Sequence, residues 1–188
     1  MEVGRTVAPV PLATDSVARL FLSERGTDAQ QRSAYAMSVI SAAITEEHEY
    51  VPAVPTTTAA LDGSEYVLTG TKYLVHAATN ADAFLVTATT PDGSGVFRVD
   101  ADAPGLQIRE QKLSDGDSLG LVELSGVRVP ADRLIGRDDA AQRLADLLTV
   151  ASCAVQLGVT EGALTLTAEY AKVREQFDRP IGTFQAVA

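Results

Sequence analysis

The segment YAKVREQFDRPIGTFQAVA, residues 170–188, holds the most specific pattern in the chain. It ends a stretch rich in alanine and leucine and free of proline, which predicts one long helix over residues 140–174. Arg179-Pro180 is expected to break that helix, because proline lacks a backbone N–H and clashes with the preceding turn. Gly182-Thr183 then offers an N-cap for another helix. The segment therefore predicts a turn between two helices.

Upstream of the long helix, the hydrophobic period changes from helical to alternating. Residues 14–40 predict two short helices, with N-caps at Thr14-Asp15-Ser16 and Thr27-Asp28 and a stop at Gly26. Residues 42–136 alternate between apolar and polar positions and contain turn signals such as Asp62-Gly63, which predicts a small antiparallel sandwich or barrel. The fold class is therefore α+β. The expected strands are 65–69, 73–76, 83–89, 95–99, 106–111 and 121–129.

Composition limits the function further. With 188 residues and 46% hydrophobic content, the chain can bury a globular core. A net charge of −10 with scattered basic residues argues against nucleic acid. We expect no membrane span, since no apolar run approaches the roughly 20 residues that a span requires. The N-terminus lacks a signal-peptide pattern, which predicts a cytoplasmic protein. One cysteine and two histidines predict no internal disulfide and no metal site.

The closing segment resembles a helical turn of the acyl-CoA dehydrogenase flavoprotein family. The shared features are Arg174 followed by Gln176-Phe177, then Pro180-Ile181 and Phe184-Gln185. Weaker phrases in the same order support the resemblance, which covers nearly the whole chain: Ala43-Ile44-Thr45-Glu46, Leu68-Thr69-Gly70-Thr71-Lys72 and Val127-Arg128-Val129-Pro130. It implies three parts: the end of an N-terminal helical domain (1–41), a middle β-domain (42–137) and the start of a C-terminal four-helix domain (138–188).

The resemblance implies an FAD-dependent oxidation of an acyl-CoA thioester. In the family, a glutamate removes the α-proton while the β-hydrogen leaves as hydride to flavin N5. Such enzymes act in fatty acid or steroid β-oxidation, and the implied partners are an acyl-CoA substrate and an electron-transfer flavoprotein as acceptor. The implied assembly is a homo- or hetero-oligomer, with a dimer of dimers expected.

Six residues match flavin-binding positions of the family. Thr45 occupies the hydrogen-bonding position of the first flavin loop. In the second flavin strand, backbone groups of Val75 and the side chain of His76 are placed to donate to the ring edge, although Leu74 stands where the family commonly has an aromatic residue. The remaining three positions, which the resemblance assigns to the FAD of a neighbouring subunit or to packing beside it, are Arg174, Phe177 and Gln185.

Two features depart from the family pattern. The first flavin loop usually continues with proline and glycines, but here Thr45 is followed by an acidic stretch, Glu46-Glu47-His48-Glu49, which we expect to be a solvated loop. The usual catalytic glutamate lies beyond Ala188, so the catalytic residue is unknown. Some members place the base on the long helix, where Glu161 and Glu169 are the local candidates, although a helix glutamate ordinarily faces water.

Three functions remain open at this stage. The first is an acyl-CoA dehydrogenase subunit represented by a partial sequence. The second is a non-catalytic partner subunit that contributes Arg174 and Gln185 to its neighbour's FAD. The third is a related flavin monooxygenase or nitroalkane oxidase. Because little helical sequence remains to cover the long helix, we expect a fragment that exposes an apolar stripe, self-associates and is inactive alone.

Overall fold

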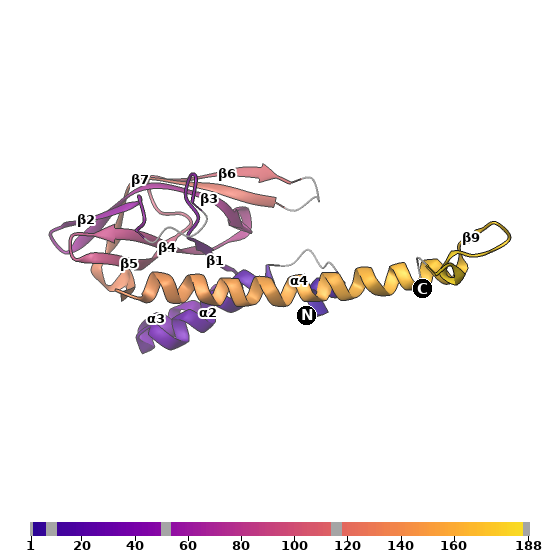
Figure 1. Ribbon diagram of the computed structural model, residues 1–188. Helices are drawn as coiled ribbons and strands as arrows, with labels where there is room; N and C mark the ends of the chain where they lie inside the picture. The colour runs from indigo at the N-terminus through magenta and orange to yellow at the C-terminus, as the bar shows by residue number, and fades with distance from the viewer. Residues whose placement is uncertain (1, 7–10, 50–53, 114–117, 186–188) are drawn as a thin grey trace. The chain divides into compact units, whose positions relative to one another are not determined.

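The computed structural model describes residues 2–6, 11–49, 54–113 and 118–185 (Figure 1). The chain divides into two compact units. The larger unit is Pro11–Thr149, and the smaller one combines Met1–Val10 with Val150–Ala188. Helices and a sheet are both present, which confirms the predicted α+β class.

Two helices open the larger unit, α2 (Leu12–Arg25) and α3 (Asp28–Tyr35). Helix α2 begins before Thr14, so the predicted cap at this residue is wrong; Thr14 is instead buried inside the helix. The cap of α3 is confirmed. The Thr27 hydroxyl accepts the backbone N–H of Gln30, and the Gln30 side chain accepts the N–H of Thr27, which forms a capping box.

Replacing Thr27 by alanine is expected to lower the free energy of unfolding by about 1 kcal/mol, because the first turn of α3 loses a side-chain acceptor. Urea denaturation of the purified chain measures the change. Thr27→Ser is the matched control, since it keeps the hydroxyl. An equal loss in both variants would show that the hydroxyl does not stabilise the helix.

One sheet of eight strands forms most of the larger unit. Two of the expected strands, 65–69 and 73–76, are parts of one long strand, and three short strands were not predicted: Ile40–Ala43, Thr58–Asp62 and Leu134–Arg137. The strands are β1 (Ile40–Ala43), β2 (Thr58–Asp62), β3 (Glu65–His76), β4 (Ala83–Thr90), β5 (Gly93–Asp100), β6 (Leu106–Lys112), β7 (Ser118–Pro130) and β8 (Leu134–Arg137).

The sheet is open. Its order is β6-β7-β3-β2-β4-β5-β8, with β1 pairing β4, so β6 and β8 remain as edges among the described residues and no barrel closes. Most pairs are antiparallel as predicted, but β1 and β2 both run parallel to β4. Neither β1 nor β2 is joined to β4 by a tight hairpin, because other strands lie between them in the chain, so these pairs can run parallel.

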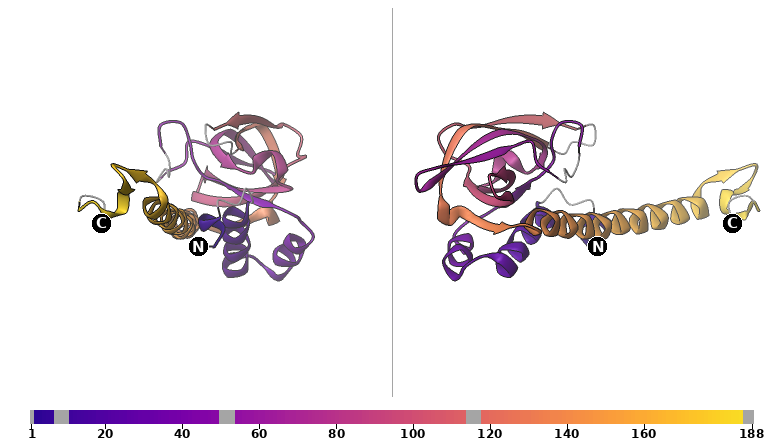
Figure 2. Two further views of the ribbon diagram at one scale, coloured as in Figure 1. Left: turned by 90° about the vertical axis from the view of Figure 1, so that its right-hand side faces the viewer. Right: turned by 60° about the vertical axis from the view of Figure 1, so that its left-hand side comes forward.

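The core of the larger unit lies where the sheet folds over itself (Figure 2). Tyr66 on β3 and Phe97 on β5 are not on neighbouring strands, yet their rings meet edge to face with centroids 5.0 Å apart. Residues from β3, β4, β5 and β7 fill the space around them; fully buried members include Leu68, Val86, Phe97 and Val122. This packed core holds the ends of β1 and β3 in a fixed relation.

Helix α4 (Ala140–Val173) runs from the larger unit into the smaller one and agrees closely with the predicted long helix. In the smaller unit, the short helix α1 (Glu2–Arg5) lies against it. A Cβ on Gly4 would meet the Val155 carbonyl oxygen at 2.0 Å, and one on Gly162 would meet the Arg5 carbonyl oxygen at 2.9 Å. Glycine at both positions therefore permits the close crossing of the two helices.

The prediction that Arg179-Pro180 breaks the long helix is wrong. Helix α4 ends at Val173, and a small hairpin follows, made of β9 (Glu175–Gln176) and β10 (Arg179–Pro180). Its central residues, Phe177 and Asp178, have φ of 54° and 59°, as a type I′ turn requires. Residues Ile181–Thr183 form one 3₁₀ turn where a new helix was expected. Residues 186–188 lie outside the described part.

Helix α4 changes character along its length. Leu144 and Leu147 are buried in the larger unit. From Val150 onward, large apolar side chains are exposed, as the predicted apolar stripe requires: Val150, Leu157, Val159, Leu164, Leu166, Tyr170 and Val173. By length and composition α4 could cross a membrane, and only 11% of its most apolar stretch is buried, so the expectation that no apolar run reaches this length is wrong. These two properties alone do not distinguish a membrane span from a helix that packs on other helices.

Candidate functional site

The structure brings Thr45 next to the strand that carries Val75 and His76. Thr45 lies two residues after β1, and its carbonyl oxygen accepts the backbone N–H of Tyr73 over 2.9 Å. The Thr45 and Val75 side chains are buried, whereas the His76 side chain is exposed. Three of the six predicted flavin residues thus lie on two adjoining segments of one unit.

The end of β3 is distorted at this place. Pairing with β7 shifts register between Lys72 and Val75, and Leu74 adopts a left-handed φ of 52°. Such a conformation is rare for a residue with a side chain and costs about 1–3 kcal/mol. The bulge leaves Leu74 42% exposed. Leu74 and His76, on either side of the buried Val75, are therefore both exposed at the end of the strand.

Beyond the bulge, the strand end is held from two sides. The Ser41 hydroxyl on β1 donates to the His76 carbonyl oxygen over 2.5 Å. On the other side, Gly120 of β7 pairs with Val75, and a Cβ at Gly120 would lie only 2.2 Å from the Cβ of Ala78. The position of Val75 and His76 thus depends on a close contact that only glycine permits.

Directly beneath these segments lies a buried ion pair. The Lys72 ammonium donates to Glu46 Oε1 over 2.7 Å and to the Thr87 hydroxyl over 3.0 Å. Glu46 also accepts from the backbone N–H and the hydroxyl of both Thr56 and Thr57, at 2.6–2.9 Å. Lys72 is fully buried and Glu46 is 4% exposed. The expectation that Glu46 belongs to a solvated acidic loop is therefore wrong, although Glu47 and Glu49 are exposed.

The surroundings of the pair determine both charge states. Burial alone would raise the pKa of Glu46, but the hydrogen bonds from Lys72, Thr57 and Thr56 lower this pKa to about 2. Burial lowers the pKa of Lys72 to about 8, although the hydrogen bond and the charge of Glu46 favour its protonated form. Near pH 7 the site therefore holds one carboxylate and one ammonium in contact.

The stability of the protein is expected to fall in acid because of Glu46. Its pKa is about 2 in the folded state and near 4.5 in the unfolded chain, so the unfolded chain binds more protons between these values. The contribution of Glu46, about 3 kcal/mol from the size of this shift, is complete above pH 4.5 and is lost as the pH falls through 2. Urea denaturation between pH 2 and pH 6 measures the loss.

The matched control for this pH dependence is Glu46→Gln, which removes the titrating group. The difference in unfolding free energy between the natural protein and the variant should shrink as the pH falls below 4.5. A difference that stays constant down to pH 2 would contradict the low pKa assigned to Glu46.

The other three predicted residues lie in the smaller unit, on and beside the β9–β10 hairpin. The Arg174 backbone joins α4 to the hairpin: its N–H donates to Tyr170 and its carbonyl oxygen accepts from Ile181. Phe177, at the tip, is 88% exposed. The side chains of Arg174 and Gln185 are also exposed. All three are therefore available at the surface of the described unit.

The hairpin is shaped by aromatic contacts that the sequence did not indicate. The Arg179 guanidinium lies over the ring of Phe184, 4.0 Å from its centroid. Phe184 in turn meets Phe177 edge to face, with centroids 6.3 Å apart. These contacts orient the tip without burying it.

Neither local candidate for a catalytic base is supported by its surroundings. Glu161 and Glu169 are both exposed on α4, as expected for ordinary helix glutamates. Within residues 2–6, 11–49, 54–113 and 118–185, no group of three histidine, cysteine or acidic side chains is placed to hold a metal ion.

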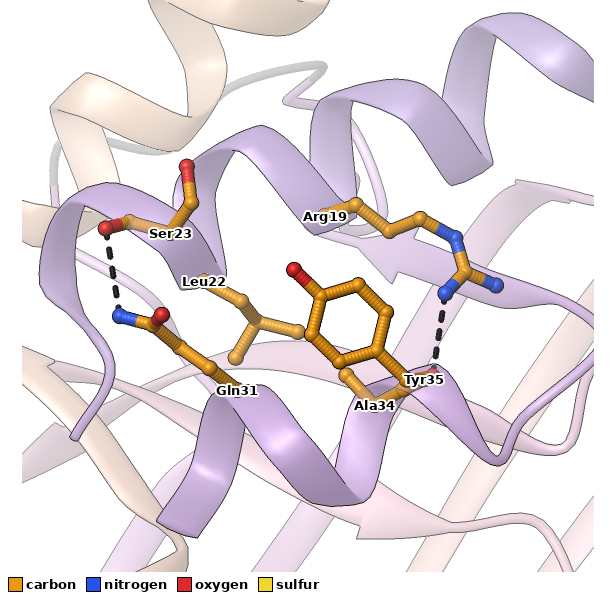
Figure 3. A pocket seen from close by; sticks show the side chains of 6 residues that line it. All are labelled: Arg19, Leu22, Ser23, Gln31, Ala34 and Tyr35. Carbon is orange, nitrogen blue, oxygen red and sulfur yellow. Dashed lines mark hydrogen bonds between the residues drawn. The ribbon is translucent and has the colours of Figure 1, made fainter. Parts of the chain in front are cut away.

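A small cavity lies away from these residues, between α2 and α3 (Figure 3). It measures about 30 Å³, which is the space of roughly one water molecule. Arg19 and Gln31 line it and donate to the carbonyl oxygens of Ala34 and Ser23. Those bonds fasten the two helices to each other, and the space is too small for a cofactor.

The amino-acid sequence matches two known domain families. The pattern of the acyl-CoA dehydrogenase middle domain matches residues 41–127, and that of the acyl-CoA dehydrogenase C-terminal domain matches residues 138–188. The chain belongs to the acyl-CoA dehydrogenase family. This confirms the resemblance inferred from the closing segment.

Individual members of the family are similar over most of the chain. Acyl-CoA dehydrogenase FadE27 of Mycobacterium tuberculosis is 49% identical over 129 residues, covering 69% of this chain and 35% of FadE27. The ChsE4-ChsE5 complex of M. tuberculosis contains a chain that is 38% identical with a TM-score of 0.90, covering 98% of this chain and 51% of that one.

A third relative contains the flavin. Glutaryl-CoA dehydrogenase of Mycobacterium smegmatis, solved in complex with FADH2, is 27% identical with a TM-score of 0.84, covering 93% of this chain and 49% of that one. The family is thus one of FAD-dependent flavoproteins. The present chain spans about a third to a half of the length of these relatives.

Proposed function

We propose that this chain is part of an FAD-dependent acyl-CoA dehydrogenase that oxidises an acyl-CoA thioester to its 2-enoyl form. The observation that carries the proposal is the match of two acyl-CoA dehydrogenase domains, in the family's order, over residues 41–127 and 138–188. We assign residues 42–137 to the middle β-domain and 138–188 to the start of the C-terminal domain. A cytoplasmic location and electron-transfer flavoprotein as acceptor are parts of the same proposal.

Thr45, Val75 and His76 are proposed to hold the flavin ring edge. Their arrangement fits this role because the two segments adjoin and the His76 imidazole is exposed beside them, where a ring nitrogen can donate a hydrogen bond. Bound FAD would supply the hydride acceptor. Leu74 offers apolar contact but no aromatic stacking, so this half of the site holds a ring less firmly than a tryptophan would.

Arg174, Phe177 and Gln185 are proposed to contact the FAD of a neighbouring subunit. The hairpin supports this role because it places an exposed arginine and an exposed aromatic ring within a few residues. A guanidinium pairs well with a pyrophosphate, and an aromatic ring contacts an adenine or flavin face. We assign no proton abstraction to the described residues, because the local candidates Glu161 and Glu169 are both exposed on α4.

The second candidate function is a non-catalytic partner subunit. Two observations favour it: the flavin loop lacks glycines and carries Glu47 and Glu49, and a similar chain belongs to the ChsE4-ChsE5 complex. Such a subunit would contribute Arg174 and Gln185 to its neighbour's FAD without binding its own. An exposed apolar face on α4 also fits a heteromeric or homomeric assembly.

Flavin uptake distinguishes the two candidates. The chain is purified alone, and also after co-expression with a full-length acyl-CoA dehydrogenase subunit, and visible flavin absorbance is recorded for both. Bound FAD in the chain alone supports the first function, and bound FAD only in the mixture supports the second. No flavin in either preparation would overturn both.

Single variants then assign the contacts. In the second function, Arg174→Ala should weaken flavin binding by the mixture at least tenfold, whereas His76→Ala should leave it unchanged. In the first function, both should weaken it. Arg109→Ala is the matched control, because Arg109 is another exposed arginine and pairs only with Glu123 among the ion pairs of the described sheet.

A further inference from the structure

We propose that Glu46 and Lys72 are positioning residues, whose buried link fixes Thr45 against the Val75–His76 segment. The inference rests on the proposed flavin role of these segments. Glu46 and Lys72 do not touch the flavin ring themselves, but they determine where the residues that contact the ring lie.

The ion pair joins the two proposed flavin segments, because each segment contributes one of its residues. Glu46 directly follows Thr45, and Lys72 lies three residues before Val75, so each flavin segment contributes one member of the link. The backbone bond from Tyr73 N–H to the Thr45 carbonyl oxygen stands beside the ion pair. Two neighbouring connections therefore join the same two segments and leave little freedom for either to slide.

Further hydrogen bonds tie Glu46 and Lys72 to the rest of the sheet. Both carboxylate oxygens of Glu46 are occupied by donors from Thr56 and Thr57, and the ammonium of Lys72 also reaches Thr87 on β4. Thr57 is fixed in its own right, since its carbonyl oxygen accepts the N–H of Thr89. The link is thus anchored to the body of the sheet, and a displacement of Thr45 would break several charge-assisted bonds at once.

The ion pair is expected to fix geometry more than it adds stability. A buried ion pair often stabilises a fold no better than apolar residues of similar volume, because both charges lose their hydration. Hydrophobic contacts have no preferred direction, whereas bonds between an ammonium and a carboxylate fix distance and orientation. What this pair adds at this place is therefore alignment. The exposed side chains of Leu74 and His76 lie within four residues of Lys72 along the strand, so the alignment acts at the surface that the flavin is proposed to meet.

The experiment compares the loss of the ion pair, which should loosen Thr45 against β3, with a general loss of stability. Lys72→Met removes the link while Glu46 keeps its threonine donors. Leu144→Ala, a fully buried position on α4, serves as the control for general destabilisation. Hydrogen exchange of the Tyr73 amide, followed by NMR, should be at least tenfold faster in Lys72→Met than in Leu144→Ala once both rates are referred to the slowest core amides. Equal acceleration in both variants would overturn the link.

Flavin titration is the second readout. In the preparation that binds FAD, Lys72→Met should raise the dissociation constant for FAD at least tenfold and shift the visible flavin absorption band, whereas Leu144→Ala should do neither. If the natural protein binds no FAD in either preparation, the proposed function fails, and the flavin role of the link fails with it. The exchange experiment still decides whether the link fixes Thr45. Should Lys72→Met not fold, Thr57→Val replaces it, because it removes one hydroxyl donor to Glu46 at similar volume.

Discussion

Replacing Glu46 by alanine is expected to lower the free energy of unfolding by about 3–5 kcal/mol. The variant leaves the Lys72 ammonium fully buried with Thr87 as its remaining partner, and it removes the acceptor for the donors of Thr56 and Thr57. An unpaired buried charge and several unsatisfied N–H and O–H groups are among the most costly defects in a protein interior. A loss of this size is a large part of the total stability of an ordinary domain. Urea denaturation monitored by circular dichroism measures it.

The matched control is the neighbouring residue. Glu47→Ala removes the same type of side chain one position along the chain, but Glu47 is exposed, and its carboxylate lies 3.8 Å from the His48 imidazole. We expect this change to stay within about 0.5 kcal/mol. Comparable losses at the two positions would mean that the burial of Glu46 does not determine the effect.

Local signals in the sequence predicted the elements that depend on local chemistry. Thr27-Asp28 was predicted as an N-cap, and α3 begins there. The stretch from Ala140 has no proline and few residues that disfavour helix, and one helix follows it through Gly158 to Val173. The antiparallel strands β4 to β7 were also predicted, from runs of β-branched and aromatic residues separated by turn signals such as Pro91-Asp92-Gly93.

The elements that were missed depend on tertiary context. All four residues of β1, Ile40–Ala43, are buried, so the strand shows no alternation and reads as the end of a helical stretch. The β9–β10 hairpin uses Phe177 and Asp178 at left-handed positions where glycine and asparagine are usual. Without the expected turn residues, the hairpin could not be predicted from the sequence.

The candidate site was only partly accessible from the sequence. The family resemblance supplied Thr45, Val75, His76, Arg174, Phe177 and Gln185, and their cofactor roles stay predictions. The buried ion pair was missed, although a signal for it was present. Tyr66, Leu68, Gly70 and Lys72 alternate along β3, so a lysine follows two core side chains on the same face. A lysine in that position requires a buried acid nearby, and Glu46 was the unrecognised partner.

Replacing Gly120 by alanine is expected to lower the free energy of unfolding by about 1–3 kcal/mol and to displace the end of β3. The new Cβ would lie 2.2 Å from the Cβ of Ala78, a distance that two carbon atoms cannot hold, so either β7 or the short 3₁₀ turn Ala78–Asn80 that follows β3 must move. Because Gly120 pairs with Val75, the movement is expected at Val75 and His76. Urea denaturation measures the stability, and amide chemical shifts of Val75 and His76 report the displacement.

Removing the obstructing methyl group provides the control. In the double variant Gly120→Ala with Ala78→Gly, one Cβ replaces another in the same space, so the two changes should compensate and the shifts of Val75 and His76 should return toward those of the natural protein. Additive losses would contradict the close contact. If flavin binding also falls in the single variant and recovers in the double one, the position of β3 and not the identity of residue 120 determines the affinity, which is the dependence that a flavin edge held by this strand requires.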